Sequence, residues 1–458
     1  MSRKLRLLVL AFAMLVFPET ADAEEIRSVV LKVGADAPVV GAGGSRRVTV
    51  RALVYPAAPV PERRASLAAA LVIDKSGSMG SDKKMENAKR GALEALRVLD
   101  SHDMAAVIVY DDESSVLVPA GPAGDYTRFE RKISRIGAGG NTALYDGVGR
   151  GADEIARFVE KGYVPRVILL SDGLANVGPS SVEELTDLAR RLARRDMTIT
   201  TIGLGLDYDE DAMTALASQS GGNAYFAKNS AALSEIFLRD MKDAVALSGR
   251  RVKATLFCDG GTKPIRTLGR KGSVKDNVME TDIGNLYGAE KYALFELEVP
   301  EGRNGTALRA GMVRVEYIDA VSGSSVTLES PLDIRYEEDP FEVAENRDVE
   351  IAYQAEMARN AEVREEAVRL ADDGRAEDAS NLLRRRADYL KFDVPLPAPL
   401  KASDEMKDDI SDFDELAEYM TENESMSAEQ RKSSLNKAHV TKNQQSDVNE
   451  RSDKDEGD

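Results

Sequence analysis

The stretch LAAALVIDKSGS, at residues 67–78, decides which fold this chain is expected to adopt. Its first seven residues are all apolar and lead directly into Asp74, Ser76 and Ser78. A continuous apolar run is typical of a strand that is buried on both faces of a parallel sheet. Such strands end at the carboxyl edge of the sheet, where open α/β folds bind ligands. A carboxylate and two hydroxyls this close together suit a small hard cation better than they suit a nucleophile.

Strand-like and helix-like segments alternate around this stretch, over residues 66–245. The segments 104–110 and 166–172, the second with an apolar centre and an Asp at its end, predict further buried strands, and apolar residues spaced three or four apart predict the helices between them. This alternation predicts a doubly wound, mostly parallel α/β sheet.

The flanking segments have the short alternating patterns of β-strands. The strands in residues 24–60 are too few to form a stable sheet alone. We therefore predict that residues 24–60 and 250–336 form one β-sandwich, with the α/β unit inserted between them. The alternative is two unrelated β segments.

The C-terminal part is expected to differ from both. Residues 341–390 have the spacing of a helical hairpin, with a turn at 372–374. Residues 401–458 are rich in Asp, Glu, Ser, Asn and Gln, which predicts a disordered acidic tail. A short helix around residues 410–420 is the one element we expect there, on a partner.

Residues 1–23 have the pattern of a secretory signal, with basic residues, a short apolar core and an Ala-x-Ala site that ends at Ala23. We predict cleavage after Ala23 and an exported protein, either periplasmic or secreted, without membrane insertion after cleavage. An uncleaved anchor is the alternative, but the apolar core is shorter than the roughly 20 residues of a spanning helix.

Composition excludes several classes of function. The formal net charge of -18 argues against nucleic acid and anionic lipid as partners. Cys258 is the only cysteine, so no internal disulfide forms. We expect His102 to be the only histidine in the folded part, with His439 in the tail, which argues against histidine-based zinc sites and against a Ser-His-Asp triad.

Three segments carry candidate ligands, and each lies where a strand or loop meets the start of a helix. They are Asp74-x-Ser76-x-Ser78, the glycine-rich segment 139–147 that contains Thr142, and Ser171-Asp172-Gly173. Each alone is an ordinary helix cap or turn. Together, in one α/β unit, they predict a metal site at one sheet edge. We expect the nearby Asp111 and Asp146 to be solvated charges rather than ligands.

These three segments, in this order, resemble the von Willebrand factor A domain with its metal-ion-dependent adhesion site. The flanking arrangement is similar to secreted bacterial members, and more distantly to inter-alpha-trypsin inhibitor heavy chains and calcium-activated chloride channel regulators. The resemblance implies that the hydroxyls of Ser76, Ser78 and Thr142 bind the ion directly. It also implies that Asp74 and Asp172 act mostly through bound water.

Mg²⁺ fits this oxygen set best, and Mn²⁺ would fit too. The resemblance further implies a protein ligand whose Asp or Glu completes the coordination of the ion. The expected function is therefore an exported, adhesion-type protein-binding module and not an enzyme.

Two alternatives remain open at this point. The first is a structural scaffold in an envelope complex, in which the ion is incidental. The second is an aspartyl-phosphate phosphotransferase that uses Asp74 as the acceptor, because Asp-Lys-Ser-Gly-Ser is similar to a motif of cation-pumping ATPases.

Overall fold

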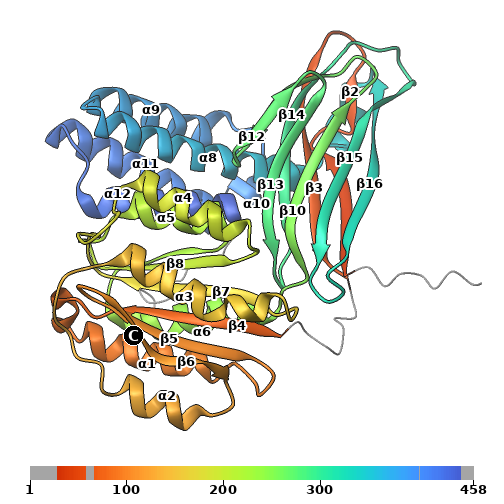
Figure 1. Cartoon of the computed structure of the whole chain (residues 1–458). Coiled ribbons are helices and arrows are strands. Elements are labelled where there is room, and N and C mark those ends of the chain that lie inside the picture. The colour runs from red at the N-terminus through yellow and green to blue at the C-terminus, as the bar shows by residue number, and fades with distance from the viewer. Residues whose placement is uncertain (1–27, 58–65, 402, 445–458) are drawn as a thin grey trace, which may run out of the picture.

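A computed structural model describes residues 28–57, 66–401 and 403–444 in three parts. An α/β domain and a β-sandwich lie side by side, and a layer of helices covers both (Figure 1). The predicted signal sequence, residues 1–23, lies outside the described residues. Within those residues, no helix combines the length and the apolar character needed to cross a bilayer.

The α/β domain is the predicted doubly wound, mostly parallel sheet. Its strand order is β6-β5-β4-β7-β8-β9, and only β6 runs antiparallel to its neighbour. The strands are β4 (Leu67–Asp74), β5 (Met104–Tyr110), β6 (Ser114–Pro122), β7 (Val164–Ser171), β8 (Thr198–Leu204) and β9 (Ala224–Ala227).

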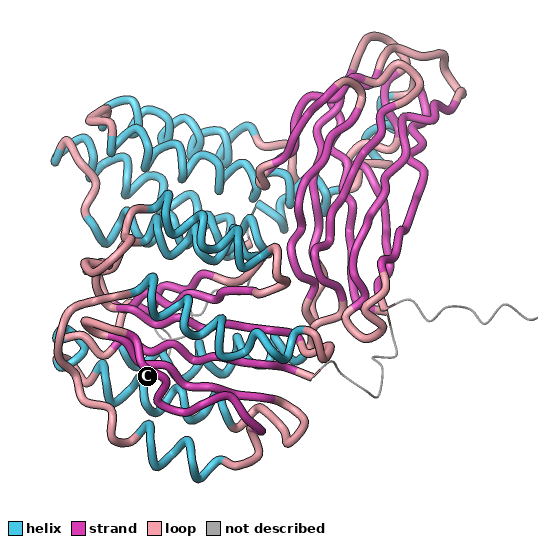
Figure 2. The backbone as a smooth tube through the Cα atoms, viewed as in Figure 1, coloured by secondary structure: helices cyan, strands magenta, loops and turns pink. Residues whose placement is uncertain are grey.

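Helices cover both faces of this sheet (Figure 2). One face packs on α1 (Lys84–Leu96), α2 (Tyr126–Ile133) and α6 (Leu233–Val245). The other face packs on α3 (Leu144–Val159), α4 (Val182–Ala193) and α5 (Glu210–Ser220). Alternate residues of β4 enter the two cores, with Leu71 in one and Val72 in the other. This explains why the run at 67–73 is apolar throughout rather than alternating.

Residues on both sides of the α/β domain form the predicted β-sandwich. One sheet has the order β1-β3-β14-β11, and the other has the order β12-β13-β10-β15-β16-β2. The strands are β1 (Val29–Ala35), β2 (Val39–Gly41), β3 (Arg46–Pro56), β10 (Gly249–Cys258), β11 (Lys263–Leu268), β12 (Gly272–Lys275), β13 (Val278–Leu286), β14 (Lys291–Val299), β15 (Ala307–Asp319) and β16 (Ser325–Glu337).

The N-terminal strands are integral to both sheets of the sandwich. Val50 of β3 pairs with Phe295 of β14, and Val40 of β2 pairs with Tyr336 of β16. The alternative of two unrelated β segments is therefore wrong. The free thiol of Cys258 is buried at the end of β10, as expected for a strand residue.

The helical part is larger than the predicted hairpin. It contains α7 (Pro340–Glu345), α8 (Val349–Asp372), α9 (Ala376–Asp388) with a π-helical turn at Tyr389–Asp393, α10 (Ala398–Lys401), α11 (Asp404–Asn423) and α12 (Ala428–Asn443). The helices α8 and α9 are the predicted hairpin, while α11 packs along α9 and α12 along α8.

The prediction of a disordered tail over residues 401–458 is wrong for α11 and α12. Phe413, Leu416 and Met420 of α11 are buried against Leu383 of α9, which a composition averaged over the whole segment does not reveal. The predicted helix at 410–420 therefore packs within the chain. Residues 445–458 lie outside the described residues.

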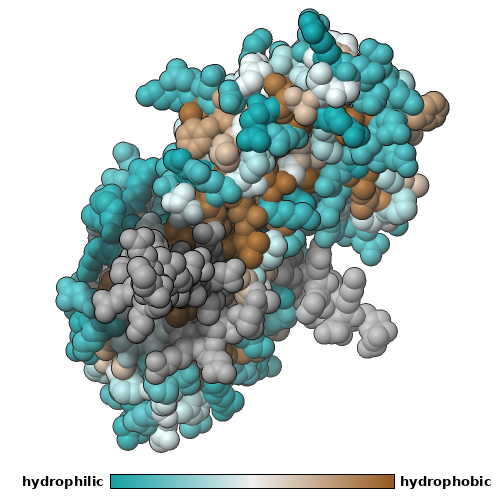
Figure 3. Space-filling model, turned by 90° about the vertical axis from the view of Figure 1, so that its right-hand side faces the viewer, coloured by the Kyte–Doolittle hydropathy of each residue, from teal (hydrophilic) through white to brown (hydrophobic). Residues whose placement is uncertain are grey.

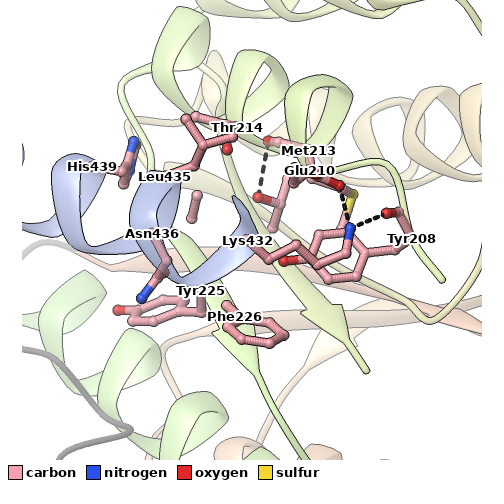
Figure 4. Close-up of a pocket in the computed structure, with 12 residues that line it drawn as sticks. Tyr208, Glu210, Met213, Thr214, Tyr225, Phe226, Lys432, Leu435, Asn436 and His439 are labelled. Atoms are coloured by element: carbon pink, nitrogen blue, oxygen red, sulfur yellow. Dashed lines mark hydrogen bonds and ion pairs between the residues drawn. The ribbon is translucent and has the colours of Figure 1, made fainter. Parts of the chain in front are cut away.

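The helix α12 connects the α/β domain to the sandwich, although few of its residues are apolar. Near its start, Lys432 pairs with Glu210 and donates a hydrogen bond to the carbonyl of Tyr208 at 2.6 Å (Figure 4). At its end, Asn443 accepts a hydrogen bond from Arg270 of the sandwich at 3.2 Å. His439 is buried on this helix, so the expectation that His102 is the only folded histidine is wrong.

The surface agrees with the charged composition. Figure 3, which turns the right-hand side of Figure 1 toward the viewer, shows a mostly hydrophilic face with hydrophobic residues in small groups.

Candidate metal centre

The three predicted segments meet at the carboxyl edge of the parallel sheet. The strands β4 and β7 are parallel neighbours, and Ile73 of β4 is paired with Leu170 of β7. The next residue of each strand, Asp74 and Ser171, therefore lies at this edge of the sheet. The glycine-rich segment before α3 is tied to the loop after β4 by backbone hydrogen bonds. The amide of Gly77 donates to Gly140 at 3.0 Å, and Gly139 donates to Lys75 at 2.7 Å. Segments far apart in sequence thus form one surface.

The three predicted hydroxyls lie close together there. The Oγ atoms of Ser76 and Ser78 are 3.1 Å apart, and Ser78 Oγ donates to Asp172 Oδ1 at 2.6 Å. A methyl group built on Gly173 would lie 3.7 Å from Ser78 Oγ and 3.8 Å from Thr142 Oγ1. Gly173 therefore lies next to hydroxyls from two other segments, at the point where the three segments meet.

The two predicted carboxylates lie beneath the hydroxyls and are fully buried. Asp74 Oδ1 accepts the amide of Ser76 at 2.8 Å, and Asp74 Oδ2 accepts Ser171 Oγ at 2.9 Å. Burial raises the pKa of the Asp74 carboxyl above its ordinary value, against these hydrogen bonds, and the charge of Asp172 adds to the rise. Two buried negative groups side by side favour a cation near them.

One cation near these carboxylates was not predicted. Lys84, in the first turn of α1, places its Nζ 2.8 Å from Asp172 Oδ2, and its side chain is only 13% exposed. The sequence gives no signal for this pair because a lysine at the start of a helix is normally solvated. The ammonium of Lys84 therefore contacts one oxygen of Asp172, while Ser78 Oγ contacts the other.

A second residue that was not predicted, Asn176, holds Thr142 in place. Its side-chain oxygen accepts a hydrogen bond from the backbone amide of Thr142 at 2.8 Å, and its backbone amide donates to the carbonyl of Thr142 at 3.2 Å. This reciprocal pair fixes the backbone of the third hydroxyl. Only the contact between two loops gives Asn176 this role.

The carboxylates that were expected not to be ligands make other contacts. Asp111 pairs with Lys75, and Asp146 accepts hydrogen bonds from the amide and hydroxyl of Ser114, at 3.1 and 2.5 Å. The nearby Asp112 accepts the side-chain amide of Asn141 at 2.6 Å.

The chemistry of this donor set fits a magnesium-like ion. Three neutral hydroxyls and two carboxylates form an all-oxygen set, which is the kind that Mg²⁺ and Mn²⁺ prefer. The described residues contain no cluster of three or more His, Cys, Asp or Glu that could hold a metal, so the two carboxylates here depend on the hydroxyls to complete a ligand set.

Comparisons with known proteins identify the α/β domain. Residues 70–239 match the family model of the von Willebrand factor type A domain. An uncharacterised protein of Synechocystis is 25% identical over 307 residues, which cover 64% of this chain and 71% of that protein. A human inter-alpha-trypsin inhibitor heavy chain is 27% identical over 164 residues, 34% of this chain and 18% of that protein.

Solved structures share the fold over most of the chain. A von Willebrand factor type A protein from Catenulispora acidiphila has a TM-score of 0.61 and 18% identity, covering 86% of this chain and 96% of its own. The ArnB paralogue from Sulfolobus acidocaldarius has a TM-score of 0.55 and 17% identity, covering 91% of this chain and 98% of its own. The similarity therefore extends beyond the α/β domain.

Proposed function

Because residues 70–239 form a von Willebrand factor type A domain, we propose that the chain is a metal-ion-dependent protein-binding module and not an enzyme. The hydroxyls of Ser76, Ser78 and Thr142 would hold Mg²⁺, and Asp74 and Asp172 would act mostly through water. The observation that carries this proposal is the convergence of hydroxyls from separate segments over two buried carboxylates.

In such a site, the hydroxyls and the carboxylates of this chain would have different roles. Hydroxyl ligands leave the charge of the ion largely uncompensated, so a bound Mg²⁺ supplies an electrophilic centre for one more oxygen. The buried carboxylates orient the hydroxyls, as Asp172 does when it accepts a hydrogen bond from Ser78. An Asp or Glu of a protein partner is the expected extra ligand, because it brings both an oxygen and a negative charge.

The phosphotransferase alternative is disfavoured by the position of Asp74. Its side chain is fully buried, and each of its oxygens already accepts a hydrogen bond, from Ser76 and from Ser171. A phosphoryl acceptor must present a free oxygen to its substrate. The scaffold alternative predicts that partner binding does not change when a chelator removes the metal.

We further propose that the chain acts outside the cytoplasm, periplasmic or secreted, on the basis of the signal sequence predicted at residues 1–23.

Metal titration of the mature chain tests this proposal. We expect Asp74→Ala and Thr142→Ala to lose Mg²⁺ and Mn²⁺ binding in calorimetry while their circular dichroism remains that of a folded protein. Thr142→Ser keeps the hydroxyl and should keep binding. Ser134→Ala, which removes an exposed hydroxyl at the end of α2, is the matched control. Unchanged affinity in the first two variants would contradict the site.

A further inference from the structure

The surface around the metal centre differs on its two sides. The order of neighbouring strands is β5-β4-β7-β8. The metal centre uses the loop after β4, at residues 75–78, and the start of the loop after β7, at Asp172. Beyond these lie the loop after β5 on one side and, on the other, the rest of the loop after β7 and the loop after β8. A partner segment that crosses the metal centre along this edge must therefore contact two unlike surfaces.

The side formed by the loops after β7 and β8 carries large exposed apolar side chains, with the exposed carboxylate of Asp207 among them. Leu174 is 59% exposed, Leu206 is 43% exposed, and Val182, at the start of α4, is 39% exposed. In the described part of the α/β domain, no other large hydrophobic side chains reach this exposure. Large exposed apolar side chains beside a polar centre are typical of protein interaction sites.

The register of the sheet places the two leucines in loops that follow neighbouring strand ends. Ser171 of β7 is paired with Gly203 of β8, and Leu174 and Leu206 each lie three residues further along their chains. The loop that carries Leu206 is also held in place, because its Tyr208 carbonyl accepts a hydrogen bond from Lys432 of α12. We call Leu174, Leu206 and Val182 the apolar rim.

The opposite side carries negative charge. Asp112 and Glu113 are exposed in the loop after β5, and Asp112 is fixed beside the metal centre by hydrogen bonds from Asn141 at 2.6 and 3.3 Å. Neither residue forms an ion pair with a cation among the described residues, whereas Asp111 is paired with Lys75. This side therefore repels a second carboxylate of a partner.

We propose that the partner is a protein segment whose metal-binding Asp or Glu has a large apolar side chain on one side only. That side chain packs on the apolar rim, and no second acidic residue lies on the side that faces Asp112 and Glu113. This inference rests on the proposed function, because the carboxylate must bind at the metal centre.

The spacing of the sheet sets the distance between the two features. Parallel strands lie about 4.8 Å apart, so the loops after β7 and β8 lie roughly 5 and 10 Å from the loop after β4. An extended peptide advances about 3.3 Å per residue. The apolar residue is therefore expected about two or three residues from the carboxylate.

Peptide selection tests the inference with a defined probe. A displayed library with one fixed central Asp and random flanks is bound to the mature chain in Mg²⁺ and eluted with EDTA. We expect enrichment of Leu, Ile, Phe or Val about two or three residues to one side of the Asp. On the other side we expect depletion of Asp and Glu.

Variants connect each preference to its surface. Leu174→Ser with Leu206→Ser should weaken the best selected peptide about tenfold and abolish the apolar preference. Its Mg²⁺ affinity in calorimetry should be unchanged. Asp112→Asn with Glu113→Gln should remove the depletion of acidic residues. Val274→Ser with Val321→Ser, two exposed valines of the sandwich, is the matched control.

The possible failures are distinguishable. EDTA-eluted peptides without an apolar preference, or with one that survives in the Leu174 and Leu206 variant, overturn the inference and leave the proposed function standing. Acidic depletion that survives in the Asp112 and Glu113 variant overturns the charged half of the inference. A selection without any Mg²⁺-dependent peptide overturns both the inference and the proposed function.

Discussion

The two edges of the parallel sheet use buried carboxylates in opposite ways. At the carboxyl edge, Asp172 contacts Ser78 and Lys84 through one oxygen each. At the amino edge, where the domain meets the sandwich, Asp240 binds Arg166 through both oxygens. Both carboxylates are fully buried and lie beside a basic side chain.

The two carboxylates differ in how many hydrogen bonds their oxygens accept. Asp240 also accepts hydrogen bonds from Thr200 at 2.9 Å and from Asn223 at 3.2 Å, while Arg166 donates to the Tyr287 hydroxyl of the sandwich at 2.7 Å. Burial opposes the charge of Arg166, but Asp240 outweighs it and raises the pKa of the guanidinium. This edge is a closed network that joins two parts of the chain.

The metal edge is open by comparison. The hydroxyls of Ser76 and Ser78 contact each other and keep acceptor capacity for another ligand. The comparison teaches that a buried carboxylate stabilises the fold when its donors saturate it, and orients a binding site when its donors are themselves potential ligands.

The strongest test of this contrast removes the cation at the amino edge. Arg166→Met should destabilise the chain by about 3–5 kcal/mol, because Asp240 is left buried without its charge partner. Urea unfolding measures the loss, and Mg²⁺ affinity of the folded variant should be unchanged. Arg166→Met combined with Asp240→Leu should recover part of the stability. Loss of Mg²⁺ binding in the folded single variant would show that the two edges are not independent.

A second test uses pH at the same junction. His439 is buried on α12, and burial lowers its pKa from 6.5 to about 4, with the charges of Arg270, Lys291 and Lys442 adding to the effect. Between pH 6.5 and pH 4, His439 is therefore protonated in the unfolded chain and neutral in the folded chain. Stability contributed by His439 is present above pH 6.5 and falls, by about 3 kcal/mol in total, as the pH drops to 4.

The control for this pH dependence is a variant without the titrating group. Urea unfolding at pH 7 and pH 4.5 should show a smaller difference in His439→Gln than in the unmodified chain. Equal differences would mean that other groups control the acid sensitivity of the junction.

The smallest expected effect is at the metal edge. Lys84→Gln removes an ammonium that neutralises part of the negative charge of Asp172, a charge that would otherwise attract the metal ion. We expect Mg²⁺ binding to tighten by about tenfold, on the order of 1 kcal/mol. Calorimetry measures the affinity, and the metal-free variant should melt lower because Asp172 loses its partner. Weaker Mg²⁺ binding would instead mean that Lys84 supports the site in its metal-bound form.

Much of the architecture was predictable because its pattern is local. The unbroken apolar run at 67–73 and the spacing of the helices that follow predicted the α/β domain, and alternating strands predicted the sandwich. All five predicted ligand residues lie at one edge. Four of them lie at or just after the ends of parallel strands, which are readable from the sequence, and Thr142 lies in a glycine-rich segment just before a helix. Lys84 and Asn176 were missed because each gains its role from a loop that is distant in sequence.

The C-terminal helices show where prediction from the sequence failed. The helix α12 is polar, yet Arg431 pairs with Asp211 and Asp372, and Lys432 pairs with Glu210. These partners are 59 to 222 residues away along the chain. A segment held by distant charges has the same composition as a disordered one.

The sequence by itself determined the order of strands and helices in the α/β domain, the residues at the ends of its strands and the oxygen-rich character of one sheet edge. These properties follow from the local periodicity of apolar side chains and from the backbone preferences of glycine, serine and aspartate. Only the tertiary structure decided which carboxylate is saturated and which stays open. It also decided which apolar side chains border the metal centre and where the polar helices dock. Each of these depends on distances between segments that the chain order does not specify.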